Sequence, residues 1–139
     1  MKKLKLWTSF VALLCVAALI IPTFAADSRA SDQISMYYMD VSTSKGYIDI
    51  EFSIKGTGTV DKLGCQSIYI YERDGDTLRY VQSVLEDDEG MSASNTFTHS
   101  NLISCSAKAG VQYEITVTLF AENSAGRDTR YRTFFVTGE

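Results

Sequence analysis

Two stretches of this chain alternate apolar and polar side chains with a period of two residues, and this limits what it can fold into. The first covers residues 48–55 and the second residues 113–119. Such a period is typical of a β-strand with one buried and one solvated face. The pattern predicts one core between sheets, made of eight side chains: Ile48, Ile50, Phe52, Ile54, Tyr113, Ile115, Val117 and Leu119.

Turn residues separate further strand-like runs. The turn Asp74-Gly75-Asp76 joins residues 65–73, rich in β-branched and aromatic side chains, to a return strand at 77–85. The glycines at 56 and 58 are expected to break the first run, and the charged segment 86–90 is expected to be a loop. The other predicted strands cover residues 34–41, 101–107 and 130–136.

The spacing of these runs indicates an all-β domain. Six or seven short strands joined by turn residues, with almost no helical periodicity, predict an antiparallel two-sheet sandwich. No segment repeats at a fixed period, so a solenoid or a propeller is excluded.

The first 25 residues have the order of a secretory signal peptide. Lysines at three of the first five positions precede an apolar run, which ends at Pro22 and is followed by small residues up to Ala25. The run is shorter than the roughly 20 residues that span a bilayer, which favours cleavage after Ala25 over a retained anchor. We expect a secreted, extracellular or envelope-associated product, with a signal peptide at 1–25, a disordered leader at 26–32 and the sandwich domain at 33–139.

The charge of the chain argues against polyanionic partners. It has 13 basic and 17 acidic side chains, and loss of the three signal-peptide lysines leaves a net charge of −7. Such a chain has no electrostatic source of affinity for nucleic acid. We therefore expect no nucleic-acid partner, and no membrane association after the signal peptide is removed.

Residues 108–126 resemble the end of a fibronectin type III domain. They contain a turn glycine, a tyrosine that opens the next strand, alternating apolar residues, and then asparagine and glycine in the following loop. The resemblance implies an immunoglobulin-like sandwich in which Tyr113 is the tyrosine-corner residue, whose hydroxyl hydrogen-bonds to backbone upstream. The chain lacks the proline before the turn glycine and the core tryptophan of the second strand, so Ile50 or Phe52 would fill that volume.

The chain is also similar to a group of small secreted proteins of Gram-positive bacteria that has no established activity. The similarity lies in the segment 58–64, in the Ile-x-Ile-Tyr strand at 68–71 and in the segment 126–130. It implies export and this fold, and it implies no mechanism.

Two cysteines follow the signal peptide, Cys65 and Cys105, and an exported chain permits them to pair. Strand alternation predicts that Cys65 lies on the outward face with Tyr69 and Tyr71, whereas a bridge between sheets needs both sulfurs inside. A β-bulge near Gly64 would turn Cys65 inward. The sequence therefore leaves the disulfide open.

Catalytic and metal chemistry has little support. His99 and Cys105 could form the imidazole–thiol pair of a hydrolase, but no oxyanion-stabilising element or orienting partner accompanies them. The acidic segments 74–76 and 86–89 offer the oxygen ligands that calcium prefers, but neither has the spacing of a calcium-binding loop. We expect no enzymatic activity, no cofactor and no metal site.

The clearest candidate for a binding surface is aromatic. If Ile68 and Ile70 face the core, the neighbouring tyrosines project from the outer face of a central strand, in the same sheet as the last two strands. Flat rings beside polar groups suit stacking on sugars or burial against a protein, although a ladder that only stabilises the sheet is the alternative. The predicted surface consists of Tyr69, Tyr71, Arg73, Phe120, Arg130 and Tyr131.

These features predict a secreted, non-enzymatic binding or interaction module for an extracellular protein or carbohydrate, present as a monomer or weak oligomer. One alternative is a self-associating structural or stress-related secreted protein. The other is a hydrolase that uses Cys105 and His99.

Overall fold

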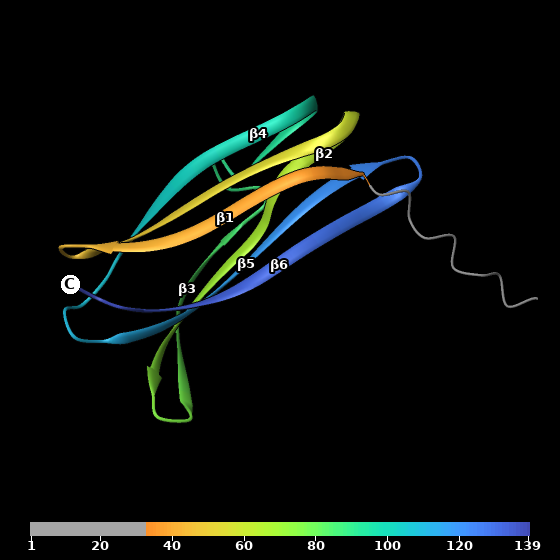
Figure 1. Ribbon diagram of the computed structural model, residues 1–139. Helices are drawn as coiled ribbons and strands as arrows, with labels where there is room; N and C mark the ends of the chain where they lie inside the picture. The colour runs from red at the N-terminus through yellow and green to blue at the C-terminus, as the bar shows by residue number, and fades with distance from the viewer. Residues whose placement is uncertain (1–32) are drawn as a thin grey trace, which may run out of the picture.

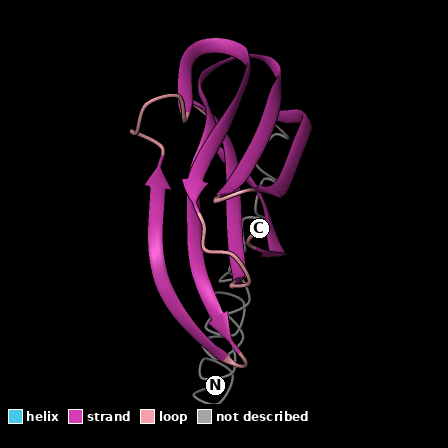
Figure 2. Ribbon diagram, turned by 90° about the vertical axis from the view of Figure 1, so that its left-hand side faces the viewer, coloured by secondary structure: helices cyan, strands magenta, loops and turns pink. Residues whose placement is uncertain are grey.

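The computed structural model describes residues 33–139, which form antiparallel β-strands and no helix (Figures 1 and 2). The prediction of an all-β chain is confirmed, and the predicted signal peptide (1–25) and leader (26–32) lie outside the described residues. The strands are β1 (Ile34–Ser44), β2 (Tyr47–Asp74), β3 (Thr77–Leu85), β4 (Ser92–Ser106), β5 (Gln112–Asn123) and β6 (Gly126–Thr137).

The long strand β2 organises the sheet, because its two parts pair with different neighbours. Its early part, residues 47–55, pairs with β1 along one edge and with β4 along the other. Its later part, residues 62–73, pairs with β5, which pairs in turn with β6. The opposite edge of the later part is shared by β3 and the beginning of β4. All six strands therefore belong to one continuous sheet.

The sheet curls around β2, so that its two parts enclose a single core. In Figure 1 the early part of β2 runs with β1 and β4, and its later part runs with β5 and β6. The eight side chains that the alternation predicts to be in the core are all buried and belong to one cluster, which confirms that prediction. Ile68 and Ile70, from the later part of β2, join the same cluster.

The glycines at 56 and 58 bend β2 and do not end it, so the predicted break was wrong. The strand continues through them, and its pairing with β4 shifts register between Lys55 and Val60. A Cβ atom on Gly56 would lie 2.8 Å from the carbonyl oxygen of Gly58, so this close bend of the backbone requires glycine. The bend carries β2 from one part of the sheet to the other.

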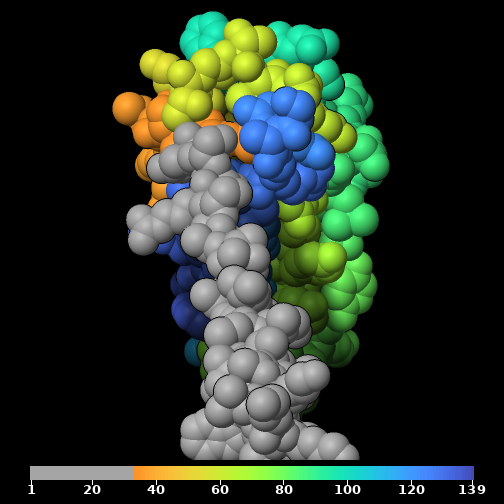
Figure 3. Space-filling view, turned by 90° about the vertical axis from the view of Figure 1, so that its right-hand side faces the viewer, coloured from red at the N-terminus to blue at the C-terminus, as the bar shows by residue number. Residues whose placement is uncertain are grey.

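Gln33 fastens the start of β1 to the bend and to the β5–β6 turn. Its backbone N–H donates to Asp128 Oδ2 at 2.6 Å, and its side-chain amide donates to the carbonyl oxygen of Gly126 at 2.7 Å. The Gln33 carbonyl accepts from the backbone N–H of Thr57 at 3.0 Å. Figure 3 shows the blue β5–β6 turn beside the yellow bend of β2, where these contacts meet.

The turns form largely where the turn residues predict them. β2 ends at Asp74 and β3 begins at Thr77, with Gly75 at a φ of +58° between them. Residues 86–90 form the predicted loop. β4, however, begins at Ser92, well before its predicted start at residue 101.

Tyr113 is buried at the beginning of β5. Its hydroxyl oxygen accepts a hydrogen bond from the backbone N–H of Lys108 at 2.8 Å. The contact reaches five residues upstream and spans the turn between β4 and β5.

Candidate functional site: an aromatic face of the sheet

The outward side chains of β3, β5, β6 and the later part of β2 form one side of the sheet. Cross-strand partners point to the same face, so the register decides which side chains share it. Tyr71 pairs with Tyr80 on β3 and with Glu114 on β5, and Glu114 pairs with Phe135 on β6. We call this side the aromatic face, after its ring-bearing residues Tyr69, Tyr71, Tyr80, Tyr131 and Phe135.

The rings of the aromatic face are open to solvent. Tyr131 is 76% exposed, Phe135 62% and Tyr80 57%. Tyr71 is partly buried against Tyr80, with ring centroids 5.9 Å apart and an interplanar angle of 71°. This is the edge-to-face geometry that aromatic pairs prefer, so the sheet holds these rings in place.

Short hydroxyl side chains fill the centre of the aromatic face. Tyr69 pairs with Thr116, and Thr116 pairs with Thr133, with the two threonine Oγ1 atoms 3.0 Å apart. In the next row Thr118 pairs with Tyr131. The surface between the rings therefore consists of short side chains with hydroxyl groups.

The charges on the aromatic face balance. Residues that pair across β3, β2, β5 and β6 form a row of neighbouring side chains. The rows that run from the one with Arg73 to the one with Tyr131 contain one outward basic side chain, Arg73, and one outward acidic side chain, Glu114. Their Nη1 and Oε2 atoms are 3.5 Å apart, and the Arg73 guanidinium lies over the Phe135 ring, 5.2 Å from its centroid. This part of the face carries no net charge.

The outer side of the other part of the sheet is acidic. Asp40 on β1 pairs with Glu51 on β2, and both point outward. Asp49 accepts hydrogen bonds from the hydroxyls of Ser104 and Ser44, which lower the pKa of its carboxyl. The two outer sides of this protein therefore differ in charge.

Two hollows lie near Arg73, the smaller one on the aromatic face and the larger one on the inner side of the β2–β3 hairpin. One has a volume of about 330 Å³ and is bordered by Arg73, Phe135 and Gln112. The other, of about 620 Å³, lies between the β2–β3 turn and the β4–β5 turn, and Gln112 and Asp74 are among its lining residues. In Figure 1 the β2–β3 hairpin projects beyond the rest of the sheet at this end.

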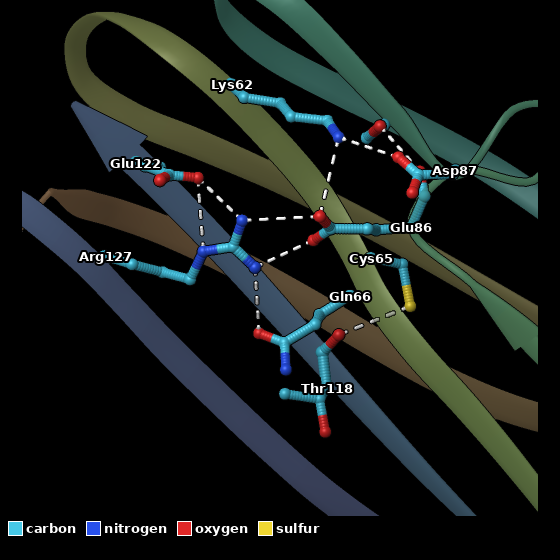
Figure 4. Close-up of polar contacts among 9 residues, drawn as sticks. Lys62, Cys65, Gln66, Glu86, Asp87, Thr118, Glu122 and Arg127 are labelled. Carbon is cyan, nitrogen blue, oxygen red and sulfur yellow. Dashed lines mark hydrogen bonds and ion pairs between the residues drawn. The ribbon is translucent and has the colours of Figure 1, made fainter.

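A network of charged side chains closes the opposite end of the face (Figure 4). The Arg127 guanidinium donates to Glu86 at 2.7 Å and to Glu122 at 2.6 Å. Lys62 Nζ lies 3.6 Å from a Glu86 oxygen and 3.2 Å from Asp87. The hydrogen bond from Arg127 lowers the pKa of the Glu86 carboxyl. The network ties the loop at 86–90 to β2 and to the β5–β6 hairpin.

Four of the six predicted surface residues lie on the aromatic face: Tyr69, Tyr71, Arg73 and Tyr131. The prediction for Phe120 was wrong, because this side chain is fully buried and the Arg127 guanidinium lies over its ring, 4.2 Å from the centroid.

The prediction for Arg130 was also wrong. It pairs with Leu119, which belongs to the core, so its side chain leaves the strand on the other side from Tyr131. Its Nη1 donates to the carbonyl oxygen of Thr129 at 2.8 Å. The sequence reasoning missed two rings of the face, Tyr80 and Phe135, although counting outward from the two predicted hairpin turns finds both.

The two cysteines are buried and free. A bulge between Cys65 and Ser67 turns Cys65 into the core. This confirms the alternative with a bulge near Gly64, and the outward direction that strict alternation predicts was wrong. The Cys65 thiol lies 3.4 Å from the carbonyl oxygen of Thr118, and burial raises its pKa to about 12. Burial also raises the pKa of Cys105. Neither thiol has the lowered pKa of a nucleophile.

Cys105 and His99 do not meet. Both lie on β4, six residues apart, which corresponds to about 20 Å along an extended strand. His99 Nε2 instead lies 2.7 Å from the carbonyl oxygen of Gly90. The pair of the hydrolase alternative is therefore not assembled.

Within residues 33–139, the acidic side chains of the segments 74–76 and 86–89 do not converge, and no group of three or more His, Cys, Asp or Glu side chains could hold a metal ion. Asp88 accepts a hydrogen bond from the backbone N–H of Leu85 at 2.7 Å. The same residues contain no helix long and apolar enough to cross a membrane.

Comparison with known proteins gives no relative: no protein-family model, no curated protein and no solved structure matches the chain.

Proposed function

We propose that this protein is a secreted, non-enzymatic binding module that engages an extracellular protein or carbohydrate through its aromatic face. One observation carries the proposal. Large rings stand open to solvent side by side on this side of the sheet, and the charges around them cancel. The exposed rings of the other outer side, Tyr38 and Tyr47, stand instead among the acidic side chains of Asp40, Asp49 and Glu51. Exposed apolar groups that gather in one patch are typical of interaction sites, whereas scattered ones are not.

The exposure of the rings favours binding over a purely structural ladder. A ladder stabilises a sheet by burying rings against their cross-strand neighbours, as Tyr71 and Tyr80 do in part. Tyr131 instead pairs with the short side chain of Thr118 and leaves most of its surface in water. Such a ring contributes little to folding, so its place on the face is better explained by a partner.

The pairing of the strands supports a fibronectin type III-like, two-layer sandwich as the scaffold of this module. The early part of β2 forms one layer with β1 and β4, and its later part forms the other with β3, β5 and β6. Layers of three and four strands are typical of immunoglobulin-like domains. The hydrogen bond between Tyr113 and Lys108 fits the tyrosine corner. A crystal structure with both parts of β2 in one flat sheet would contradict this scaffold.

The test of the function is co-sedimentation of the purified protein with the insoluble envelope of the cells that produce it. Two double variants are compared with the wild type. Tyr69→Ser with Tyr131→Ser strips the aromatic face, and Tyr38→Ser with Tyr47→Ser makes the same chemical change on the acidic side. Circular dichroism checks that both variants keep the wild-type fold.

We expect the wild type and the acidic-side variant to sediment alike, and the aromatic-face variant to lose at least about 90% of its binding, since central aromatic side chains dominate such surfaces. Equal sedimentation of the two variants, or a wild type that stays in solution, would reject the proposal.

A further inference from the structure

We infer that the ligand of the aromatic face is an uncharged polysaccharide. The inference rests on the proposed function and narrows its partner to one class. It is carried by three properties of the face: the arrangement of its rings, the hydroxyl groups between them, and its lack of net charge beside a hollow lined by polar groups.

The rings form a platform of the kind that sugar rings can cover. Tyr69 and Tyr71 alternate along β2 and are therefore about 7 Å apart on the same face. Tyr131 and Phe135 extend the platform two strands away, on β6. The aliphatic C–H groups of a sugar ring pack against the face of an aromatic ring, where the π-electrons are negative. Several rings on one rigid sheet can engage successive units of one chain.

The side chains between the rings match the hydroxyls of a sugar. Thr116, Thr118 and Thr133 occupy the centre of the face. The hydroxyls of Thr116 and Thr133 share one hydrogen bond, which leaves one of their two donors free, and all three oxygens can accept from a ligand. Sugar hydroxyls can likewise both donate and accept. Serine and threonine are under-represented among the residues that dominate protein–protein binding, so this centre fits a carbohydrate better than a protein.

The charge of the face selects an uncharged chain. Arg73 and Glu114 offset each other, so no unpaired base is left in these rows to bind a carboxylate or sulfate. The chain as a whole is acidic and would repel an anionic polymer. A neutral polysaccharide meets neither obstacle.

The smaller hollow beside Arg73 can receive the end of the polymer. It has a volume of about 330 Å³, and Gln112 and Thr137 line it together with Phe135. The Gln112 amide and the Thr137 hydroxyl can each donate and accept a hydrogen bond, as a sugar hydroxyl does. A chain that lies across the rings can therefore reach polar groups at its end without leaving the surface.

The test is electrophoresis of the native protein through gels that contain a soluble polysaccharide. Hydroxyethyl cellulose, xylan and mannan serve as uncharged probes, and carboxymethyl cellulose shares its glucan backbone with the first but is anionic. The variants are Tyr69→Ala, Tyr131→Ala and Gln112→Ala, with Tyr38→Ala as the control on the acidic side.

We expect at least one uncharged polymer to retard the wild type and the Tyr38→Ala control equally, with carboxymethyl cellulose far less effective. Loss of either ring of the face should weaken binding about tenfold, as expected for a central aromatic side chain. Gln112→Ala should weaken it several-fold. Preference for the anionic polymer, or binding that survives both ring substitutions, would overturn the inference.

Two further outcomes separate this inference from the proposed function. If no uncharged polymer binds while sedimentation with the envelope still depends on the face, the partner is a protein, and the function stands without the inference. If light scattering shows a dimer that Tyr131→Ala dissociates, the occupant of the face is a second copy of the chain, and both fail.

Discussion

Gly64 is the residue at which substitution by alanine should destabilise the protein most. It lies in β2 at a φ of +151°, a conformation that residues with a Cβ atom rarely adopt. A Cβ atom built there would lie 2.2 Å from the carbonyl oxygen of Met91 and 2.6 Å from the Cα atom of Ser92. Both are backbone atoms, so no side chain can rotate away to relieve the overlap.

The cost of Gly64→Ala follows from two contributions. Backbone strain at such a φ costs about 1 to 3 kcal/mol. Relief of the overlap must separate β2 from β4, which breaks the hydrogen bond from Cys65 N–H to Met91 O, 2.7 Å long, at a further cost of about 1 to 3 kcal/mol. The sum is about 2 to 6 kcal/mol, a large share of the 5 to 15 kcal/mol that is typical of a domain. We expect a fall in Tm of about 10 to 30 °C.

Thermal and urea unfolding followed by circular dichroism measure this effect. Gly58→Ala is the matched control, because Gly58 lies in the same strand, has no positive φ, and its added Cβ would meet nothing within 4 Å. The control should change stability by no more than about 0.5 kcal/mol. A Gly64→Ala variant that unfolds at the wild-type midpoint would refute the close approach of β2 and β4 at this residue.

Three further predictions concern stability and use the same unfolding assay. Tyr113→Phe should cost about 1 to 2 kcal/mol, because it leaves the backbone N–H of Lys108 without its acceptor; no loss would contradict that contact. The pKa of Cys65 is raised from 9.0 to about 12, so the wild type should lose up to about 1.4 kcal/mol per pH unit relative to Cys65→Ala between those pH values, and parallel pH profiles would contradict its burial. Arg127→Ala should cost about 1 to 2 kcal/mol at neutral pH. This difference should shrink as the pH falls below 4.5, the ordinary pKa of Glu86, because the lowered pKa stabilises the fold only while that carboxylate is ionised; a constant difference would contradict the ion pair.

Much of the fold follows from local rules of sequence. Alternation at residues 48–55 and 113–119 identifies the core residues. All apolar side chains of each strand point to the same face, so this is the face that the fold must bury. The Asp-Gly turn predicts β3 with both of its bounds. The bend at Gly56 was missed, since a glycine that ends a strand and one that lets a strand bend look alike in sequence. The early part of β4 was missed because its serines and Asn95 are typical of turns and loops, and pairing with β2 overrides that preference.

The candidate site was predictable where simple counting applies. From the turn at residues 124–125, counting outward pairs Tyr131 with Thr118 and Phe135 with Glu114, and the same count places Arg130 on the core side. Cys65 could not be predicted in this way, because one bulged residue reverses every direction beyond it. Phe120 has the correct parity for the outer side and is still buried, because Arg127 folds over it from the neighbouring strand. Contacts of that kind depend on tertiary packing.

The most direct test of the aromatic face is a titration of the ¹⁵N-labelled protein with an uncharged oligosaccharide, followed by the chemical shifts of its backbone amides. The largest changes should fall on β2, β5 and β6 around Tyr69, Thr116 and Tyr131, with the acidic side around Asp49 and Glu51 unchanged. Changes that gather around Asp49 and Glu51 instead would contradict the account.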